Sequence, residues 1–492
     1  MIKPLLVSAD SQPLYQQLYQ HVRQAILNGE LKRGMQLPSS RSLASQLSLS
    51  RNTVLNAYEQ LIAEGYLESY SGQGTFVARN LPELDLPTLQ SSNQANPSQA
   101  QHRLADHALD QIYAPQMTNN ATSAHLIGQP LSSGIPAIAD FPSGLWQRLQ
   151  HQQIRHLGKA SLGYQAAKGY APLREAIAKH IGLTRQVQCS PEQILITNGA
   201  QAALNLAIHG LLNAGEQVWM EDPGYLGVRG VLLGAGASIV PVPVDHEGLQ
   251  VASGIALAPH ARLVYVTPSH QFPLGSTLSL SRRLQLLEWA AQQQAYILED
   301  DYDSEYRYAG RPIASLYSLD QAERVLYVGT FSKVLFPALR IGYLVVPPNL
   351  VEPFTLLRRL ADVHTPLINQ ATLAEFINAG HFSRHLHRMC QLYAQRRDYM
   401  LQLLRELGLE VNAPPAGMYC TAWLPAGIDA QMVTSLAAQR GLLIENVNHF
   451  ALRPLSRQGI LLGYAGFSPE LMRAGIEQLG QILQQLQTGT IN

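Results

Sequence analysis

The sequence predicts an α/β protein with a small N-terminal domain, a larger domain built on a mostly parallel sheet, and a smaller C-terminal subdomain. Residues 1–79 show helical patterns followed by a hairpin pattern. From about residue 125, apolar strand-like runs alternate with helix-like stretches, which is typical of buried strands joined by helices. After about residue 375 helical patterns dominate and a mixed segment follows. A chain of 492 residues also exceeds one ordinary core, so two or more domains are expected.

Residues 1–79 predict three helices and a β-hairpin. The first helix ends at Asn28-Gly29 and carries apolar residues at helical spacing: Leu14, Leu18, Val22 and Ile26. Serines at 39–40 and 48–50 are N-caps for two further helices, SRSLASQL and RNTVLNAYEQLIAEG. We expect four apolar side chains of the third helix to face inward: Val54, Ala57, Leu61 and Ile62. Two strands around a turn at 71–74 complete a winged helix-turn-helix.

Such a domain places its second motif helix in the major groove of DNA. Three residues with suitable chemistry occupy the first turn of that helix: Arg51, Asn52 and Thr53. Arg41 begins the preceding helix, near the expected phosphate path, and Gly72 and Gly74 would let the wing approach the DNA backbone. The segment holds seven Lys/Arg against five Asp/Glu, which is only weakly basic. A three-helix adaptor with solvated arginines is therefore the alternative.

Composition limits the remaining classes of protein. Residues 80–124 are rich in Gln, Ser, Pro and Asn and predict a flexible linker. Lys+Arg and Asp+Glu both number 35, so any DNA-binding part must be small. The three cysteines fit neither a metal site nor a disulfide framework: Cys189, Cys390 and Cys420. The N-terminus lacks a signal-peptide core, and no apolar run approaches the roughly 18 residues that span a bilayer. We expect a cytoplasmic protein with no metal and no membrane partner.

The segment YVGTFSKVLFPALRIGYLV places a single lysine, Lys333, between two strand-like runs. A lysine amine at a strand end can form a Schiff base with an aldehyde cofactor. Ser332 precedes this lysine and Arg340 follows it by seven residues, and hydroxyl and guanidinium groups can hold a phosphate. Alone, the pattern is better explained by a surface lysine after a strand, so the prediction depends on three other segments.

The first of these segments, TNGAQAALNLAIHGLL, leads from a strand into a helix through a turn of three residues: Gly199, Ala200 and Gln201. The free N–H groups of such a turn suit a phosphate, although many βα turns share this pattern. In LEDDYDSEYRY, Asp300 ends a strand, where a buried carboxylate can pair with a protonated pyridine nitrogen. Tyr302 can then hydrogen-bond a ring hydroxyl, and an acidic capping loop is the alternative. In EDPGY, Tyr225 follows a Pro-Gly turn, where it can stack on a cofactor ring or simply pack in the turn.

Long stretches of the chain resemble known families. GELKRGMQLPSSRSLASQLSLSRNTVLNAYEQLIAEGYLESYSGQGTFV resembles the winged helix of GntR-family regulators. This resemblance implies that DNA is contacted by Arg41, Arg51, Thr53 and a wing that runs from Gly72 to Thr75. Residues 125–485 resemble fold type I aminotransferases, which depend on pyridoxal 5′-phosphate. The order of EDPGY, TPSHQFPLG, LEDDYDSEYRY and GTFSKVLFPALRIGY resembles the MocR subfamily of GntR-type regulators, in which a linker joins a winged helix to an aminotransferase-like domain.

The MocR resemblance implies a role for each residue of the large domain. Lys333 would carry pyridoxal phosphate, Asp300 would pair with its pyridine nitrogen, Tyr225 would stack on the ring and Tyr302 would lie near the ring hydroxyl. The other implied cofactor contacts are Ser332, Arg340 and the turn of Gly199, Ala200 and Gln201 on the phosphate, and His270 and Gln271 beside the ring. Fold type I sites form at dimer interfaces, so Tyr164 would reach the partner's phosphate in a head-to-tail homodimer in which each winged helix reaches over the other subunit.

Two positions depart from the aminotransferase pattern. Leu274 stands where the related pattern has Thr, and Phe272 stands where many aminotransferases have an Asn that touches the ring hydroxyl. Both departures argue against a full transaminase. A carboxylate-binding arginine is expected in the C-terminal subdomain, with Arg453 as the candidate and Arg457 as its rival. If neither serves, the effector is pyridoxal phosphate itself rather than an amino acid.

The sequence therefore predicts a transcription regulator that binds a double-stranded DNA operator and senses an amine, an amino acid or pyridoxal phosphate through Lys333. Regulation of vitamin B6 or of amine and amino-acid metabolism is the expected role. A working aminotransferase with a DNA-binding appendage is the first alternative, because the Lys333–Asp300 pair permits at least a half-reaction. The second alternative is a DNA-binding protein whose large domain has lost its cofactor.

Overall fold

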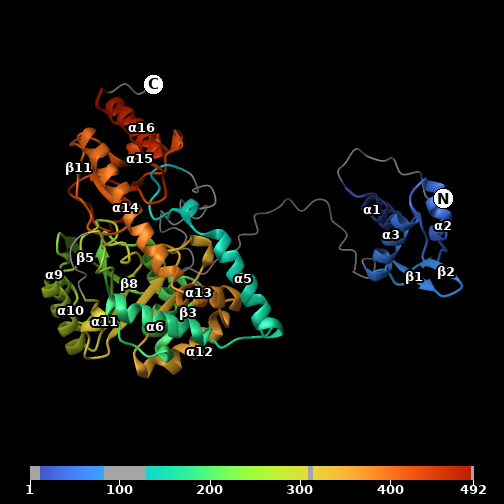
Figure 1. The fold of residues 1–492 in the computed structure, drawn as a ribbon, viewed down its shortest axis with the longest axis horizontal. Coiled ribbons are helices and arrows are strands. Elements are labelled where there is room, and N and C mark those ends of the chain that lie inside the picture. Colours follow the sequence, from blue (N-terminus) through green and yellow to red (C-terminus); the bar gives the residue numbers. More distant parts are fainter. Residues whose placement is uncertain (1–11, 83–128, 309–313, 489–492) are drawn as a thin grey trace. The chain divides into compact units, whose positions relative to one another are not determined.

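The computed structural model describes residues 12–82, 129–308 and 314–488 (Figure 1). The chain divides into two compact units, one around the N-terminal helices and one around the large sheet. Most of the predicted linker, 83–124, lies outside the described residues. Within the described part, no helix combines the length and apolarity needed to cross a membrane.

The N-terminal unit is a winged helix-turn-helix, as predicted. Its elements are α1 (Leu14–Leu27), α2 (Ser40–Leu47), α3 (Arg51–Ala63), β1 (Leu67–Tyr70) and β2 (Gly74–Val77). The side chain of Ser39 caps α2 by accepting from the N–H of Ser42, and that of Ser50 caps α3 by accepting from the N–H of Thr53. The strands pair in antiparallel fashion across the predicted turn. Leu81 is 2 % exposed and belongs to the core of this unit.

One predicted core position of the N-terminal unit is wrong. Ile62 is 37 % exposed, and Tyr58 takes the expected inward place, with its hydroxyl donating to the carbonyl oxygen of Pro38 at 3.0 Å. Buried residues of α3 fall at 54, 57, 58 and 61, the spacing of one helical face, and Ile62 lies just beyond its edge. Leu14 is 41 % exposed because it starts α1, before the helix reaches the core.

An eight-stranded sheet organises the second unit, and most of its strands alternate with helices along the chain, as the apolar strand-like runs predicted. The strands are β3 (Ile194–Thr197), β4 (Gln217–Asp222), β5 (Ser238–Asp245), β6 (Gly248–Leu249), β7 (Leu263–Val266), β8 (Tyr296–Asp301), β9 (Val325–Thr330) and β10 (Gly342–Val345). Their order is β3-β10-β9-β8-β7-β4-β5-β6. The five adjacent strands β9, β8, β7, β4 and β5 pair in parallel. β10 runs antiparallel to both of its neighbours, and β6 runs antiparallel to β5.

Helices cover both faces of this sheet, so the strands are buried on each side. One face packs against α7 (Ala200–Leu211), α8 (Leu226–Gly234) and α12 (Val351–Asp362). The opposite face packs against α6 (Ala171–Arg185), α9 (Val251–Leu257), α10 (Leu280–Gln293) and α11 (Leu316–Leu319). Alternation along β4 shows the division, because Met220 joins the first core and Trp219 the second. This arrangement explains why the strand sequences are almost continuously apolar.

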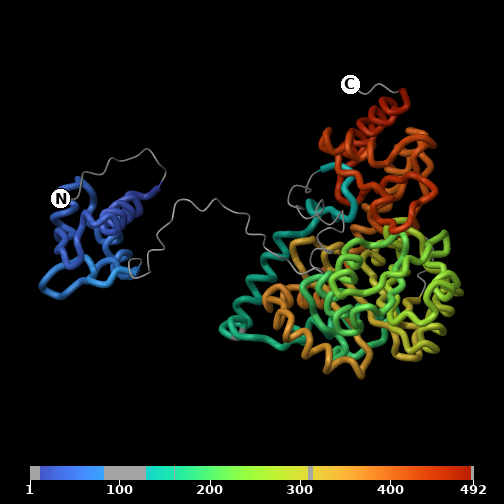
Figure 2. Tube along the Cα trace, turned by 180° about the vertical axis from the view of Figure 1, so that it is seen from behind, coloured from blue at the N-terminus to red at the C-terminus, as the bar shows by residue number. Residues whose placement is uncertain are grey.

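A smaller subdomain follows the sheet, as predicted, and gathers at one end of the unit (Figure 2). Helices α5 (Ser143–Leu157) and α13 (Leu367–Asn378) pack together, and α14 (His381–Glu406) leads into the subdomain. An antiparallel sheet follows, in the order β11 (Glu410–Val411), β12 (Tyr419–Trp423), β14 (Gly459–Gly463) and β13 (Glu445–Asn446). It carries α15 (Ala430–Gln439) and α16 (Pro469–Thr488). The backbone N–H of Gly463 donates to the carbonyl oxygen of Leu131 at 2.7 Å, which ties residues 129–137 to this subdomain.

Candidate functional site

The predicted cofactor residues converge at one edge of the large sheet. Asp300 lies at the carboxyl end of β8, and Lys333 follows the carboxyl end of its parallel neighbour β9. Because β10 is antiparallel, its first residue Gly342 pairs with Thr197 at the end of β3, and Gly199 follows there. Tyr225 follows β4 at the same edge. Ligands of open α/β sheets bind at this edge, where loops converge and helices begin.

Lys333 is half-buried, and its Nζ donates to the carbonyl oxygen of Gly134 at 3.0 Å. Gly134 has a φ of +67°, and a Cβ there would lie 2.7 Å from Nζ. The segment before α5 therefore passes directly over the lysine. Burial lowers the pKa of Lys333, and the negative charges of Glu445 and Asp303 oppose that shift. A lowered pKa favours the neutral, nucleophilic amine.

Asp300 is 5 % exposed and only half satisfied by the protein. Its Oδ2 accepts from the hydroxyl of Tyr265 at 2.8 Å, whereas the buried Oδ1 has no partner among the described residues. Burial raises the pKa of Asp300 to about 7, and Asp301 and Asp303 add to the shift, although the bond from Tyr265 opposes it. A buried carboxylate with one unfilled oxygen is suited to a cationic donor.

The start of α7 and Arg340 form a cradle suited to an anion. Gly199, at a φ of +88°, precedes the helix, whose first turn has no side-chain cap. The Nη2 of Arg340 donates to the carbonyl oxygen of Asn198 at 3.0 Å, so the guanidinium lies over Gly199. A Cβ on Gly342 would come within 2.8 Å of the Ala200 nitrogen, which shows how closely the two backbones approach. Buried Ser332 adds a hydroxyl without a partner in the described structure.

Tyr225 feels the charges of both the Asp300 carboxylate and Arg340 of the anion cradle. Burial raises its pKa to about 12, with Asp300 adding to the shift and Arg340 opposing it, so both charges are near its ring. Its hydroxyl donates to Oε1 of Gln201 at 3.3 Å, and Nε2 of Gln201 donates to the Gly227 carbonyl at 2.8 Å. Gln201 therefore holds the EDPGY loop in place.

His270 and Tyr302 belong to a buried network rather than standing alone. Nδ1 of His270 lies 3.0 Å from Asp303, and its ring stacks on that of Tyr419, with 4.8 Å between the centroids. The Tyr302 hydroxyl lies 2.7 Å from the hydroxyl of Tyr419 and also 2.7 Å from the carbonyl oxygen of His270. Nε2 of His270 is buried without a described partner. Gln271 instead bonds to the loop around Pro223, so its side chain shapes the turn beside the site.

Other predicted residues lie away from this network. Arg453 is exposed, and its backbone N–H donates to Oδ2 of Asp222 at 3.1 Å. Arg457 forms a two-pronged ion pair with Glu410 and lies over the ring of Trp423.

Tyr164 is 90 % exposed, and its only described ring contact is with His364, at 6.2 Å between centroids.

Sequence reasoning missed several residues of the site. Gly134, Glu445 and Tyr419 lie more than 80 residues from Lys333 in the sequence, and their patterns showed only a loop, a short strand and a buried strand. Asp303 and Tyr265 carried a signal: the first lies within the acidic run after β8, and the second is a polar group in an otherwise apolar strand.

The predicted DNA-contacting residues lie on the outer surface of α2 and α3. Arg41, Arg51 and Asn52 are exposed, whereas Thr53 is half-buried and its hydroxyl lies 2.8 Å from that of Ser50. In the wing, Gly72 and Gly74 have φ values of +76° and +111°. Packing within the unit also requires a glycine at 74. A Cβ there would lie 2.8 Å from Nε2 of Gln36, which donates to the Gln73 carbonyl oxygen.

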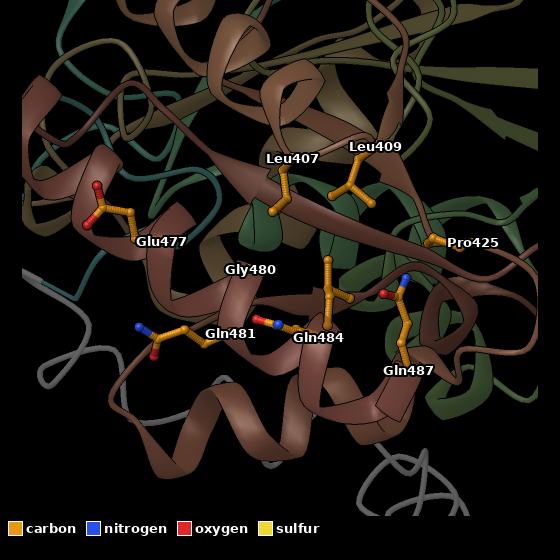
Figure 3. Close-up of a pocket in the computed structure, with 9 residues that line it drawn as sticks. Leu407, Leu409, Pro425, Glu477, Gly480, Gln481, Gln484 and Gln487 are labelled. Carbon is orange, nitrogen blue, oxygen red and sulfur yellow. The ribbon is translucent and has the colours of Figure 1, made fainter. Parts of the chain in front are cut away.

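A surface groove in the C-terminal subdomain lies apart from these residues. Leu407 and Leu409 form its apolar side, and Gln481 and Gln484 of α16 face them (Figure 3). Of the residues predicted to hold a cofactor or effector, none is among the described residues that line the groove.

Comparisons with known proteins identify both units. Residues 14–77 match the model "Bacterial regulatory proteins, gntR family", and residues 130–479 match "Aminotransferase class I and II". The probable rhizopine catabolism regulatory protein MocR of Rhizobium meliloti is 38% identical over 470 residues, covering 95% of this chain and 93% of the relative. This chain belongs to the MocR subfamily of GntR-family regulators. The winged helix-turn-helix and the aminotransferase-like domain thus form a transcription regulator.

Another curated relative and two solved structures are also similar to this MocR-type regulator. The pyridoxine biosynthesis transcriptional regulator PdxR of Corynebacterium glutamicum is 30% identical and covers 93% of each chain. Among solved structures, an archaeal alanine:glyoxylate aminotransferase matches with a TM-score of 0.71 and 28% identity, over 78% of this chain and 98% of its own. The α-aminoadipate aminotransferase LysN of Thermus thermophilus, complexed with N-(5′-phosphopyridoxyl)-L-leucine, matches with a TM-score of 0.68 and 27% identity, over 78% and 96% of the chains. The predicted fold type I architecture is confirmed.

Proposed function

We propose that this regulator binds pyridoxal 5′-phosphate at Lys333 and uses it to sense a small molecule that changes the affinity of the winged helix for an operator. The observation that carries the proposal is the half-satisfied carboxylate of Asp300, buried at the edge of the sheet where Lys333, Arg340 and the start of α7 also converge. Bound pyridoxal phosphate would supply an electrophilic carbon that reacts with amines.

The described residues fit the cofactor by their chemistry. Asp300 would pair with the pyridine nitrogen, since its free oxygen needs a donor and its raised pKa falls when a positive charge is near. Arg340, Ser332 and the N–H groups of Ala200 and Gln201 would hold the phosphate. Tyr225 would cover one face of the ring, and Tyr302 and His270 would lie toward the ring hydroxyl.

Visible absorbance of the purified chain with pyridoxal phosphate tests this assignment. We expect a band that free cofactor lacks, and we expect it to disappear in Lys333→Ala but not in Lys159→Ala, an exposed lysine of the same unit. Borohydride reduction followed by peptide mass analysis should fix the cofactor to the peptide that contains Lys333. A wild-type chain without the band would support only the DNA-binding half of the proposal.

A head-to-tail homodimer belongs to the same proposal. Exposed apolar side chains cluster at the end of α12 and the loop before α6: Leu162, Tyr164, Leu356, Leu360 and Val363. The contact of Tyr164 with His364 joins these two segments. Such a surface favours burial against a second copy, where Tyr164 would reach the partner's phosphate. Leu360→Glu should lower the sedimenting mass from dimer to monomer, whereas an unchanged mass would exclude this face.

The proposal includes a DNA-binding domain in 1–79, a linker in 80–124 and a sensing domain in 125–492. It also includes a cytoplasmic location, because a regulator of this kind must reach its operator. Selection from a random pool of duplex DNA should yield one enriched motif with the full chain. The effector and pathway are open between pyridoxal phosphate itself, in vitamin B6 metabolism, and an amine or amino acid.

An active aminotransferase is the second candidate, favoured by the intact pair of Lys333 and Asp300. Sustained turnover of an amino donor and a keto acceptor would establish it. A single stoichiometric conversion, or none, would leave the regulator as the function of the domain.

A further inference from the structure

The side of the site that faces the C-terminal subdomain is backed by an apolar and aromatic wall, of which Phe272 and Tyr302 are half-buried members. Tyr419, Val447, Phe450 and Leu461 are buried in one cluster, and Phe272 packs against it. The ring of Phe272 meets that of Phe450 edge-on, with 4.9 Å between the centroids. A carboxylate buried against such a wall would lose its hydration without gaining a cation. This wall therefore favours an uncharged carbon chain over an acidic one.

Acidic groups lie beside this wall, close to the lysine. Ser133 donates a hydrogen bond to Glu445 on β13, and the next residue, Gly134, accepts from Lys333 Nζ at 3.0 Å. Glu445 therefore contacts Ser133, the residue next to the Gly134 carbonyl that accepts from the Lys333 amine. The charge of Glu445 acts on Tyr419 as well as on Lys333. Asp303, paired with His270, adds a second negative charge that acts on Lys333.

Positive groups of the subdomain are directed elsewhere. The Arg457 guanidinium pairs with Glu410 at the Trp423 end of β12, and Tyr419 begins that strand. Trp423 lies four residue steps along the strand from Tyr419, or about 13 Å. Arg229 belongs to α8 rather than to the subdomain; it is buried, and its guanidinium donates to the backbone carbonyl oxygen of Phe450 in the wall at 2.6 Å.

Arg453 is exposed at the surface, where only its backbone is held by Asp222. Among the described groups whose charges act on Lys333, Glu445 and Asp303 are acidic, and the cation is Arg340, which belongs to the anion cradle.

We propose that the effector is an amine without a carboxylate. Glu445, held by Ser133, accepts a hydrogen bond from an ammonium or hydroxyl group at the opposite end of the effector from its primary amine. The proposal rests on the cofactor assignment above and deepens it by naming the class of ligand. Lys333 and the cofactor receive the primary amine, the aromatic wall covers the carbon chain, and Glu445 accepts from the terminal donor. A charged acceptor forms the stronger bond, especially where water is largely excluded.

Spectral titration of the pyridoxal phosphate-loaded full chain tests the proposal with ligands of equal length. The probes are 1,4-diaminobutane, 4-amino-1-butanol and 4-aminobutyrate, and the measured quantity is the equilibrium Kd from the change in the visible band. We expect the diamine or the aminoalcohol to bind at least tenfold more tightly than 4-aminobutyrate. A preference for the diamine over the aminoalcohol would identify an ion pair, and equal affinities would identify a hydrogen bond.

Two variants separate Glu445 from the rest of the site. Glu445→Gln should abolish the preference over 4-aminobutyrate while the visible band of the loaded protein remains, and Glu445→Lys should reverse it. Arg453→Ala should leave all three affinities within twofold. If the glutamate variants fail to hold the cofactor, Ser133→Ala, which removes only the positioning hydroxyl, should weaken the preference instead.

The opposite results are equally clear. Tighter binding of 4-aminobutyrate, particularly if Arg453→Ala abolishes it, would overturn the proposal and restore a carboxylate-binding arginine. A visible band that no amine changes would also overturn it, although the cofactor assignment would stand. Absence of the band in the wild-type chain would instead refute the cofactor assignment on which the proposal rests.

Discussion

Replacing Asp300 by Asn should make the cofactor-free protein more stable at alkaline pH. Burial raises the pKa of this carboxyl group to about 7, against an ordinary value near 3.9. The folded state therefore binds the proton more tightly than the unfolded state, and ionisation of Asp300 destabilises the fold as the pH rises. This penalty is absent below about pH 4, grows between about pH 4 and 7, and is complete above about pH 7.

The magnitude follows from 1.36 kcal/mol for each pH unit between the two pKa values. Ionisation of Asp300 therefore lowers the free energy of unfolding by about 1.5 kcal/mol at pH 5 and by about 4 kcal/mol at pH 8. Asp300→Asn removes ionisation but keeps an oxygen for the Tyr265 hydroxyl. Any constant effect of the amide cancels when two pH values are compared. Relative to wild type, the variant should gain about 2.5 kcal/mol between pH 5 and pH 8, or roughly 5 °C of melting temperature for so large a domain.

Thermal unfolding of the full cofactor-free chain at pH 5 and pH 8 measures this difference. Tyr265→Phe is the matched control, because it removes the bond that lowers the Asp300 pKa and should steepen the pH dependence. Pyridoxal phosphate should raise the melting temperature of wild type more than that of Asp300→Asn at pH 8, since only the carboxylate can pair with a protonated ring nitrogen. Parallel pH profiles of wild type and Asp300→Asn would refute the reasoning, whatever their absolute melting temperatures.

Three further substitutions test other parts of the molecule. Ser50→Ala removes the N-cap of α3 and should cost about 1 kcal/mol, seen as faster hydrogen exchange of the first amides of that helix; unchanged exchange would contradict the cap. Gly342→Ala places a Cβ 2.8 Å from the Ala200 nitrogen and should weaken pyridoxal phosphate binding at least tenfold, whereas Gly144→Ala, with nothing within 4 Å, should not. Arg51→Ala should weaken operator binding, with a loss of sequence preference if Arg51 contacts a base, or a salt slope lower by about one if it contacts a phosphate; an operator affinity equal to wild type would exclude both roles.

Local chemistry in the sequence determined the elements and most of the site. Serines at helix starts, glycines at turns and a 3.6-residue apolar period define the N-terminal unit, and uninterrupted apolar runs define the strands. Asp300 and Lys333 could be assigned to one site because each follows a buried strand, and parallel strands end at the same edge. Ile62 shows the limit of this reasoning, since one position around a helix separates the core from solvent and only packing decides it.

Tertiary structure alone decided which distant groups complete the site. The antiparallel direction of β10 brings Arg340 and Gly342 against the start of α7, and no local pattern distinguishes that direction from a parallel one. The C-terminal subdomain brings Tyr419 to Tyr302 across 117 residues and Glu445 to Ser133 across 312. Local periodicity reports which face of an element is apolar, but the contact between two faces depends on how the whole chain packs. For that reason the sequence could predict the lysine and the carboxylate of the proposed cofactor site, whereas only the fold decided which wall lies beside them.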